Sequence, residues 1–285
     1  MFVVIGATGN TGSVVAETLL AQKQPVRVVV RSADKGLSWQ AKGAEVAVAS
    51  LDDVPALTKA LRGAQGLYLL VPPNYGAPAW LAAQRQRMDQ AAEAVKSSGV
   101  LHVVFLSSVG GQIPEGTGPI RAARYGEQQL ATVAQNLTIL RPCYFMDNWA
   151  SVMGMAKSQG VLPTFISPAA RIPMISTKDI GLVGAERLIM GGKGKQIVEL
   201  AGPEEYSPDQ AAAALSQILG KAVSAQLAPL SAVVPTFKSF GFSDEAAQLF
   251  EGMYTSFSKG TIEYEHPASL VRGTVILSEA LRGMV

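Results

Sequence analysis

The sequence predicts an α/β fold, in which a doubly wound parallel sheet carries a smaller, mostly helical C-terminal lobe. Short β-branched runs alternate with longer amphipathic stretches over the first half of the chain, which is the pattern of successive strand–helix units. These runs are apolar throughout, as expected for strands covered by helices on both faces of a sheet. A glycine-rich turn follows the first run and opens the first helical stretch.

Six strands and four helices are expected in this first half. The strand runs are residues 2–5, 26–30, 45–48, 67–71, 103–106 and 137–140. The helical stretches are residues 12–22, 54–62, 79–98 and 120–134. A composition that is 48% hydrophobic and only 16% charged supplies enough apolar surface for a large core around them.

The regular alternation of strand and helix patterns ends after residue 150, so a domain boundary is expected there. The predicted sheet domain is 1–150, and the predicted second lobe comprises 151–175 and 201–285. Residues 176–200 begin with a capping-box-like Ser176-Thr-Lys-Asp179 and end in a strand-like run, so they are expected to pack back on the sheet. The helices expected in this second half are 147–159, 177–190 and 208–219.

Charge and cysteine content exclude several classes of function. The net charge is +2 and no basic cluster is dense enough to neutralise a phosphate backbone, so no direct nucleic acid partner is expected. Cys143 is the only cysteine, and two isolated histidines predict no metal site. With no signal-like start and no apolar run of the roughly 20 residues that span a bilayer, the chain is expected to be cytoplasmic and not membrane-bound.

A glycine pattern, Gly6-Ala-Thr-Gly9-Asn-Thr-Gly12, lies directly after the first predicted strand. In this context Gly6 permits a tight turn, Gly9 lets the backbone approach a pyrophosphate, and Gly12 lets the helix lie close to the strand. Residues 1–150 are therefore predicted to be an NAD(P)-binding domain of Rossmann type, although such turns also serve as plain connections. The cofactor contacts expected here are those of Gly6, Thr8, Gly9, Asn10, Thr11 and Gly12.

The end of the second predicted strand favours NADP(H) over NAD(H). An NAD site usually carries an acidic residue there, whereas this chain carries Arg31, which can pair with a 2′-phosphate with help from Ser32 and Lys35. The alternative is a solvated surface arginine. After the third strand, Asp52 is a candidate for the adenine amine, but either Asp52 or Asp53 must also cap the next helix.

Together these features resemble the atypical short-chain dehydrogenases, and within them the NmrA-like branch. The resemblance rests on the glycine spacing, on Leu106-Ser-Ser108 and Leu140-Arg-Pro142 after two strands, and on Phe145-Met-Asp-Asn148. Residues 242–260 are similar to the C-terminal helices of triphenylmethane and quinone reductases of that branch. The resemblance implies that the cofactor is lined, from adenosine to nicotinamide, by Val71, Pro72, Pro73, Ser107, Ser108, Pro142, Tyr144 and Phe145.

The chain departs from the superfamily at its usual catalytic pair. The Tyr-x-x-x-Lys pattern supplies a proton donor and a lysine that lowers its pKa, but here Tyr125 is followed four residues on by Gln129. Many relatives in this branch instead carry Lys or His four residues before a glutamate. This chain lacks that base as well, because Ala123 stands four residues before Glu127. Tyr125 is left as the only candidate acid.

Hydride transfer to a quinone or a cationic conjugated acceptor does not need a positioned acid, because a phenol-like product with a pKa of about 10 is readily protonated by water. The sequence therefore predicts an NADPH-dependent reductase of quinone-like or conjugated aromatic acceptors. A homodimer is a possible assembly of the chain. The alternative is a non-catalytic NADP(H)-binding redox sensor of the NmrA type, which has less need of an aromatic pocket. The candidates for acceptor contacts, each of which also fits core packing, are Tyr75, Trp80, Tyr144, Phe145, Trp149, Phe250, Met253 and Tyr254.

Overall fold

An eight-stranded parallel sheet forms the centre of the computed structural model, which describes residues 1–285. The strand order is β13-β10-β6-β5-β4-β1-β2-β3, and every neighbouring pair is parallel, which confirms the predicted fold class. The strands are β1 (Phe2–Ile5), β2 (Val26–Val30), β3 (Glu45–Val48), β4 (Gly66–Leu69), β5 (His102–Leu106), β6 (Asn136–Pro142), β10 (Lys195–Ala201) and β13 (Val271–Arg272).

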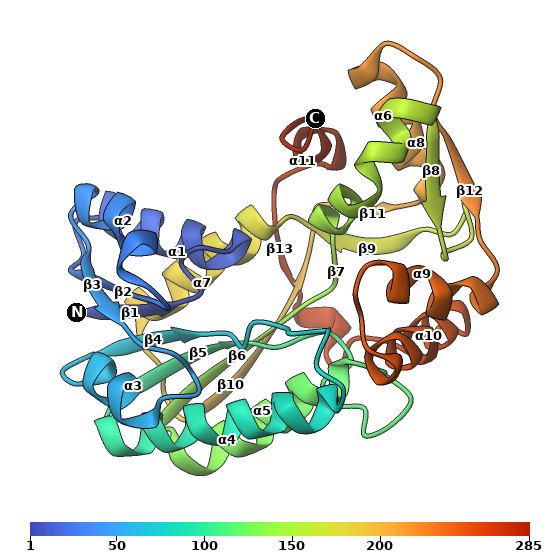
Figure 1. The fold of residues 1–285 in the computed structure, drawn as a ribbon. Helices are drawn as coiled ribbons and strands as arrows, with labels where there is room; N and C mark the ends of the chain where they lie inside the picture. Colours follow the sequence, from blue (N-terminus) through green and yellow to red (C-terminus); the bar gives the residue numbers. More distant parts are fainter.

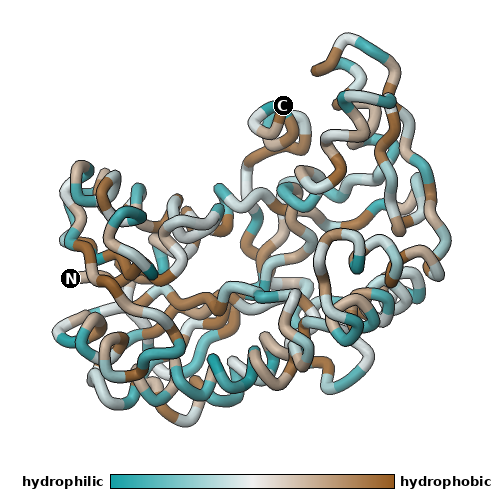
Figure 2. Tube along the Cα trace, in the orientation of Figure 1, coloured by the Kyte–Doolittle hydropathy of each residue, from teal (hydrophilic) through white to brown (hydrophobic).

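Helices cover both faces of this sheet (Figure 1). One face carries α1 (Asn10–Ala21), the short α2 (Leu37–Ala41) and α7 (Thr177–Met190). The other carries α3 (Val54–Leu61), α4 (Trp80–Ser98) and α5 (Ile120–Val133). Successive residues of β1 alternate between the two resulting cores, since Val4 packs with α1 and α7 whereas Val3 packs with α3 to α5. Figure 2 shows the central strands as largely hydrophobic and much of α4 as hydrophilic.

The smaller lobe contains more strand than its sequence predicts. Beside its helices it has a three-stranded sheet of β7 (Tyr144–Phe145), β9 (Ile172–Ile175) and β11 (Glu205–Tyr206), and a two-stranded sheet of β8 (Val161–Thr164) and β12 (Ser224–Leu227). Strands of two to four residues leave too short a pattern for a period of two to be read from the sequence. The helices of the lobe are α6 (Met153–Gln159), α8 (Pro208–Leu219), α9 (Val233–Ser239), α10 (Asp244–Ser258) and α11 (Leu277–Arg282).

Local capping explains where several of these helices begin. The Ser207 hydroxyl and the Gln210 side chain form a complete capping box at the start of α8. At α7 only half of the expected box forms: Ser176 accepts from the backbone N–H of Asp179, but the Asp179 carboxylate binds the C-terminal segment instead. The expected helix over 147–159 is a 3-10 turn, Met146–Val152, followed by α6.

The chain passes repeatedly between the sheet and the lobe. After β6 it enters the lobe, then α7 packs on α1, and β10 pairs with β6 through Val198 and Leu140. It returns once more at β13 before α11 packs on α8. None of the helices combines the length and the apolar character that crossing a membrane requires.

Candidate active site

The glycine turn between β1 and α1 has the geometry of a phosphate cradle. Gly6 has a φ of +85°, a conformation that residues with a side chain rarely adopt. A Cβ on Gly12 would overlap the carbonyl oxygen of Gly6, so this glycine is required by the fold itself. Gly9 is different, because its backbone is extended and the nearest atom to an added Cβ, the Gly6 oxygen, would lie 3.4 Å away. The space beside Gly9 is therefore open toward solvent.

The first turn of α1 offers unpaired donors at this place. Gly9 is the N-cap and has no side chain with which to cap the free N–H groups of the first turn. The first turn also contains no acidic residue that would repel an anion. Thr8 and Asn10 are exposed at the turn, whereas Thr11 is buried against the sheet. A pyrophosphate fits this helix end by both charge and space.

Arg31 lies at the end of β2, exposed and with no hydrogen bond or ion pair to any group of the chain. Ser32 and Lys35 follow it in an exposed 3-10 turn. The hydroxyl of Ser32 donates to the Asp34 carboxylate and thereby holds the pKa of Asp34 below its usual value. Arg31 and Lys35 are thus the free cations at this strand end.

The structure shows which of Asp52 and Asp53 caps the helix that follows β3. Asp53 accepts from the backbone N–H of Ala56 at 3.0 Å and caps α3. Asp52 accepts from Ser50 and forms an exposed ion pair with Arg87 at 3.3 Å. Its contact with adenine stays a prediction.

Residues beyond the ends of β4 and β5 differ in how open they are. Val71 is half-buried, while Pro72 and Pro73 are exposed. Ser107 is buried, and its hydroxyl donates to Glu127 at 2.5 Å, whereas the Ser108 hydroxyl donates to the neighbouring Val109 carbonyl. A hydroxyl already bound to a buried carboxylate contributes to the wall of a cofactor site more through its position than through a free donor.

A buried ion cluster lies directly behind these residues. Arg141 on β6 pairs with Glu127 on α5 through two hydrogen bonds of 2.8 and 2.6 Å, and with Glu265 of the C-terminal segment at 2.5 Å. Both Arg141 and Glu127 are almost fully buried. In the sequence, Glu127 served only to locate the position where a catalytic Lys or His is absent. Its buried ion pair with Arg141 was not predicted.

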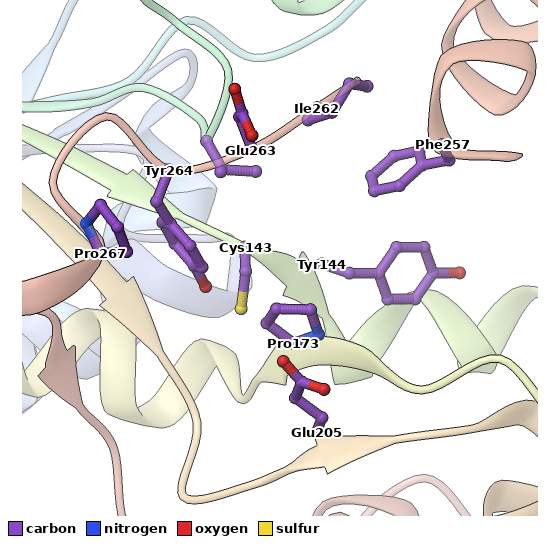
Figure 3. A pocket seen from close by; sticks show the side chains of 10 residues that line it. Cys143, Tyr144, Pro173, Glu205, Phe257, Ile262, Glu263, Tyr264 and Pro267 are labelled. Atoms are coloured by element: carbon purple, nitrogen blue, oxygen red, sulfur yellow. The ribbon is translucent and has the colours of Figure 1, made fainter. Parts of the chain in front are cut away.

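A cavity of about 280 Å³ opens where β6 passes into β7 (Figure 3). Cys143 and Tyr144 enter it from that strand end, β9 and β11 contribute one wall, and the C-terminal segment contributes the opposite one. The lining residues are Val109, Cys143, Tyr144, Pro173, Glu205, Phe257, Ile262, Glu263, Tyr264 and Pro267. Only Tyr144 among them was predicted as a contact, because the C-terminal segment carries no motif that would have placed it here.

Hydroxyl and thiol groups in the cavity are held in their neutral forms. Burial raises the pKa of Tyr144 well above its usual value, and burial raises that of its neighbour Tyr254 to about 12. Burial likewise raises the pKa of the Cys143 thiol to about 11, and the adjacent Tyr264 phenol is raised in the same direction. Cys143 thus lines the cavity, yet as an unreactive neutral thiol.

A network of packed aromatic rings contains Tyr75, Trp80, Phe250 and Tyr254, whereas Trp149 belongs to the core of the smaller lobe. Tyr75 stacks on Phe242 at 4.3 Å between ring centres and meets Phe250 edge-on at 5.2 Å. Trp80 and Trp149 are only 4% and 3% exposed, so a direct contact with a ligand would require this packing to open. Met253 lies against Gly118 at the start of α5.

Tyr125 does not line the cavity. Its hydroxyl donates to Asp89 on α4 at 2.7 Å, and this hydrogen bond raises its pKa. Arg124, at the preceding position of α5, donates to the carbonyls of Gly111 and Gln112, so it is engaged with the loop after β5. No Tyr-Lys pair is therefore assembled on α5.

Comparison with known proteins places this arrangement in a family. A sequence profile of the NmrA-like family matches residues 1–271. The NAD(P)H azoreductase of Xenophilus azovorans is 26% identical over 89% of this chain and 86% of its own length. Quinone oxidoreductase 2 of Escherichia coli (strain K12) is 28% identical over 91% of this chain and 89% of its own length.

Solved structures agree over the whole chain. The crystal structure of an NADPH-dependent quinone oxidoreductase from Escherichia coli complexed with NADPH has a TM-score of 0.84 at 25% identity, and covers 100% of this chain and 99% of the other. A Citrobacter sp. triphenylmethane reductase complexed with NADP(H) shares the fold with a TM-score of 0.82 at 20% identity, over 100% and 99% of the two chains. Because the family match runs from residue 1 to residue 271, this chain is a member of the NmrA-like family, as its motifs predict.

Proposed function

We propose that the protein is an NADPH-dependent reductase that transfers hydride to quinone-like or conjugated aromatic acceptors without a Tyr-Lys pair. The observation that carries this proposal is the aromatic cavity at the end of β6, on the same sheet edge as the glycine turn. In open α/β sheets, ligands bind outside the carboxyl ends of the strands. The relatives are named as reductases of azo compounds and quinones, which agrees with such an acceptor.

The residues present fit a nicotinamide dinucleotide. The Gly6–Gly12 turn and the first turn of α1 would hold its pyrophosphate, because Gly9 leaves room for it and the N–H groups there are free. When bound, the cofactor supplies a hydride. The preference for NADPH over NADH is assigned to Arg31, whose guanidinium has no partner within the chain.

Within the cavity, this chain's own residues orient the acceptor and exclude water. Tyr144 lies beside Tyr254, and its ring meets Phe257 edge-on at 6.4 Å. Phe145 packs into the main core beside it. Such fixed rings position a flat acceptor, which is the main requirement when no acid takes part.

The test is oxidation of NADPH by the purified protein with a panel of quinones, conjugated dyes and simple ketones. Turnover is expected with the quinones and dyes and not with the ketones, because reduction of a ketone needs the proton donor that this site lacks. Reduction of the ketones would contradict the acid-free mechanism. Tight NADPH binding without turnover of any acceptor would instead favour the redox sensor.

Three further expectations belong with this function. We propose a cytoplasmic location, a homodimer and no direct binding of nucleic acid, the last because the net charge is only +2. Fractionation of the host cells, light scattering and a duplex-binding titration at physiological salt test them separately.

A further inference from the structure

The walls of the cavity combine aromatic rings with carboxylates and contain no basic side chain. Tyr144, Phe257 and Tyr264 supply the rings, and Glu205 and Glu263 are the only charged residues in the lining. Figure 3 shows the two carboxylates on opposite sides of the cavity. Aromatic faces attract cations through their quadrupole, and such cages are used in proteins to bind quaternary ammonium groups.

Both carboxylates are free, although the backbone at each position is fixed. The amide of Gln112 donates to the Glu263 carbonyl at 2.8 Å, and Arg171 donates to the Glu205 carbonyl at 2.7 Å. Neither carboxylate forms an ion pair within the chain. Arg171 and Arg272 are the nearby cations; neither belongs to the lining, and each donates to a backbone carbonyl, Arg171 to that of Glu205 and Arg272 to that of Gly202.

We propose that this cavity selects cationic aromatic acceptors, with Glu205 and Glu263 as the residues that determine the preference. The inference rests on the proposed function and names the class of acceptor for it. An anionic acceptor would be repelled by the two carboxylates and a neutral one would gain nothing from their charge, whereas a cation brought within a few ångströms of each gains Coulomb energy even in a solvated setting.

A cationic acceptor also suits a site that has no proton donor. Such an acceptor takes up a hydride, which carries two electrons and one proton, from C4 of the dihydronicotinamide. One C–H bond breaks and one forms, the acceptor becomes neutral and the nicotinamide becomes cationic, so no further proton is consumed. A quinone needs one additional proton to reach the hydroquinone. The phenol of Tyr125, bound to Asp89 outside the cavity, is not available to supply it.

The binding test uses three redox-inert probes of one size class: phenyltrimethylammonium, its neutral isostere tert-butylbenzene, and benzenesulfonate. Calorimetry on the protein, with and without NADP⁺, is expected to give the highest affinity for the cation and the lowest for the anion. In the double variant Glu205→Gln/Glu263→Gln, affinity for the cation should fall about fivefold per carboxylate at low salt, with that for the isostere unchanged. Glu204→Gln, at an exposed carboxylate outside the lining, is the matched control and should change nothing.

A second arm measures turnover of a cationic triarylmethyl dye and of a neutral quinone by the same variants. The double variant should raise KM for the dye about fivefold or more, with kcat for both acceptors and KM for the quinone changed less than twofold. Equal affinity of the parent protein for cation and isostere, or an equal effect of Glu204→Gln, would overturn the proposal. If no acceptor is turned over but the cation preference and its loss in the double variant persist, the proposed function fails and the binding preference stands.

Discussion

At the scale of single residues, the glycines of the turn serve two different requirements, one set by the fold and one by ligand binding, which the sequence pattern does not distinguish. Gly12 is needed by the fold, because a side chain there would overlap the backbone of Gly6. Gly9 is not, because its φ of −105° and ψ of 176° are open to any residue. The fold therefore does not require a glycine at this position, and the missing side chain is explained by a ligand that approaches the backbone from outside.

Gly9→Val is expected to abolish NADPH binding and leave the protein folded, since its branched side chain would stand where the pyrophosphate lies. Gly12→Val is expected to prevent correct folding, because backbone atoms cannot move aside. Circular dichroism checks folding and calorimetry checks binding. A folded Gly9→Val variant that binds NADPH with parent affinity would make the turn a purely structural connection.

Arg31→Ala should reduce the preference for NADPH over NADH by roughly 10- to 150-fold, because a hydrogen bond to a charged group contributes about 1.5 to 3 kcal/mol. Affinity for NADH should hardly change. Titration calorimetry with both nucleotides measures this, and Arg62→Ala, at an exposed arginine after α3, is the matched control. A preference that survives in Arg31→Ala would move the 2′-phosphate contact to another residue.

Tyr125→Phe is expected to leave turnover within about twofold, whereas loss of a general acid costs about 10²-fold or more. The reason is the hydrogen bond from Tyr125 to Asp89, which raises the pKa of the phenol and holds it on the α4 side of α5. Tyr144→Ala and Phe145→Ala should instead raise KM for the acceptor. Steady-state kinetics with a quinone decide between these patterns, and a large loss confined to Tyr125→Phe would contradict the mechanism.

At the scale of elements, α5 is attached to the sheet by charge as well as by apolar packing. Glu127 is on its inner face and pairs with Arg141 on β6, while Glu265 brings the C-terminal segment to the same guanidinium. Buried charges of this kind stabilise a structure only when both partners are present, since a single one is left without compensation. The cluster therefore ties three separate parts of the chain to one position behind the cofactor edge.

Glu127→Ala should lower the free energy of unfolding by about 3 to 5 kcal/mol, because Arg141 then stays buried without its main partner. The exposed pair between Lys178 and Glu279, 3.3 Å apart, offers the contrast. Glu279→Ala should change stability by less than about 1 kcal/mol. Urea denaturation measures both variants, and equal effects would show that burial does not govern these ion pairs.

At the scale of the whole molecule, buried carboxylates fasten the returning C-terminal segment across the sheet edge. Glu199 on β10 accepts from the backbone N–H groups of Glu265 at 2.8 Å and His266 at 2.6 Å. Asp179 on α7 accepts from those of Thr274 and Val275, both at 3.1 Å. Ile262, Glu263 and Tyr264, just before the first anchor, and Pro267, just after it, line one wall of the cavity, so the shape of the cavity depends on both parts of the protein.

Asp179→Asn keeps the shape of the side chain but turns one acceptor oxygen into an NH2 group that faces a backbone N–H. Loss of a hydrogen bond to a charged group, about 1.5 to 3 kcal/mol, should speed amide exchange at Thr274 and Val275 roughly 10- to 150-fold. Hydrogen-exchange mass spectrometry follows these amides. Asp209→Ala, at an exposed aspartate of α8, should leave their exchange unchanged, and protection that survives in Asp179→Asn would place the anchor elsewhere.

Much of the fold follows from the sequence because its signals are local. The first six strands lie within two residues of their predicted bounds, since apolar runs and glycine ends are readable without knowledge of the partners. The glycine turn and Arg31 follow in the same way, because each stands at a fixed place relative to a strand end. Membership of the NmrA-like family rests on these same motifs and is confirmed by the match over residues 1–271.

The tertiary structure alone decided which distant residues meet. Glu205 and Glu263 carry no motif, and they face one cavity only because β11 and the C-terminal segment return to the end of β6. Likewise, nothing near Tyr125 in the sequence indicates that Asp89 on α4 binds its hydroxyl. Hydrophobic period and capping specify an element from its neighbours in the chain, whereas a site assembled from long-range contacts depends on how those elements pack.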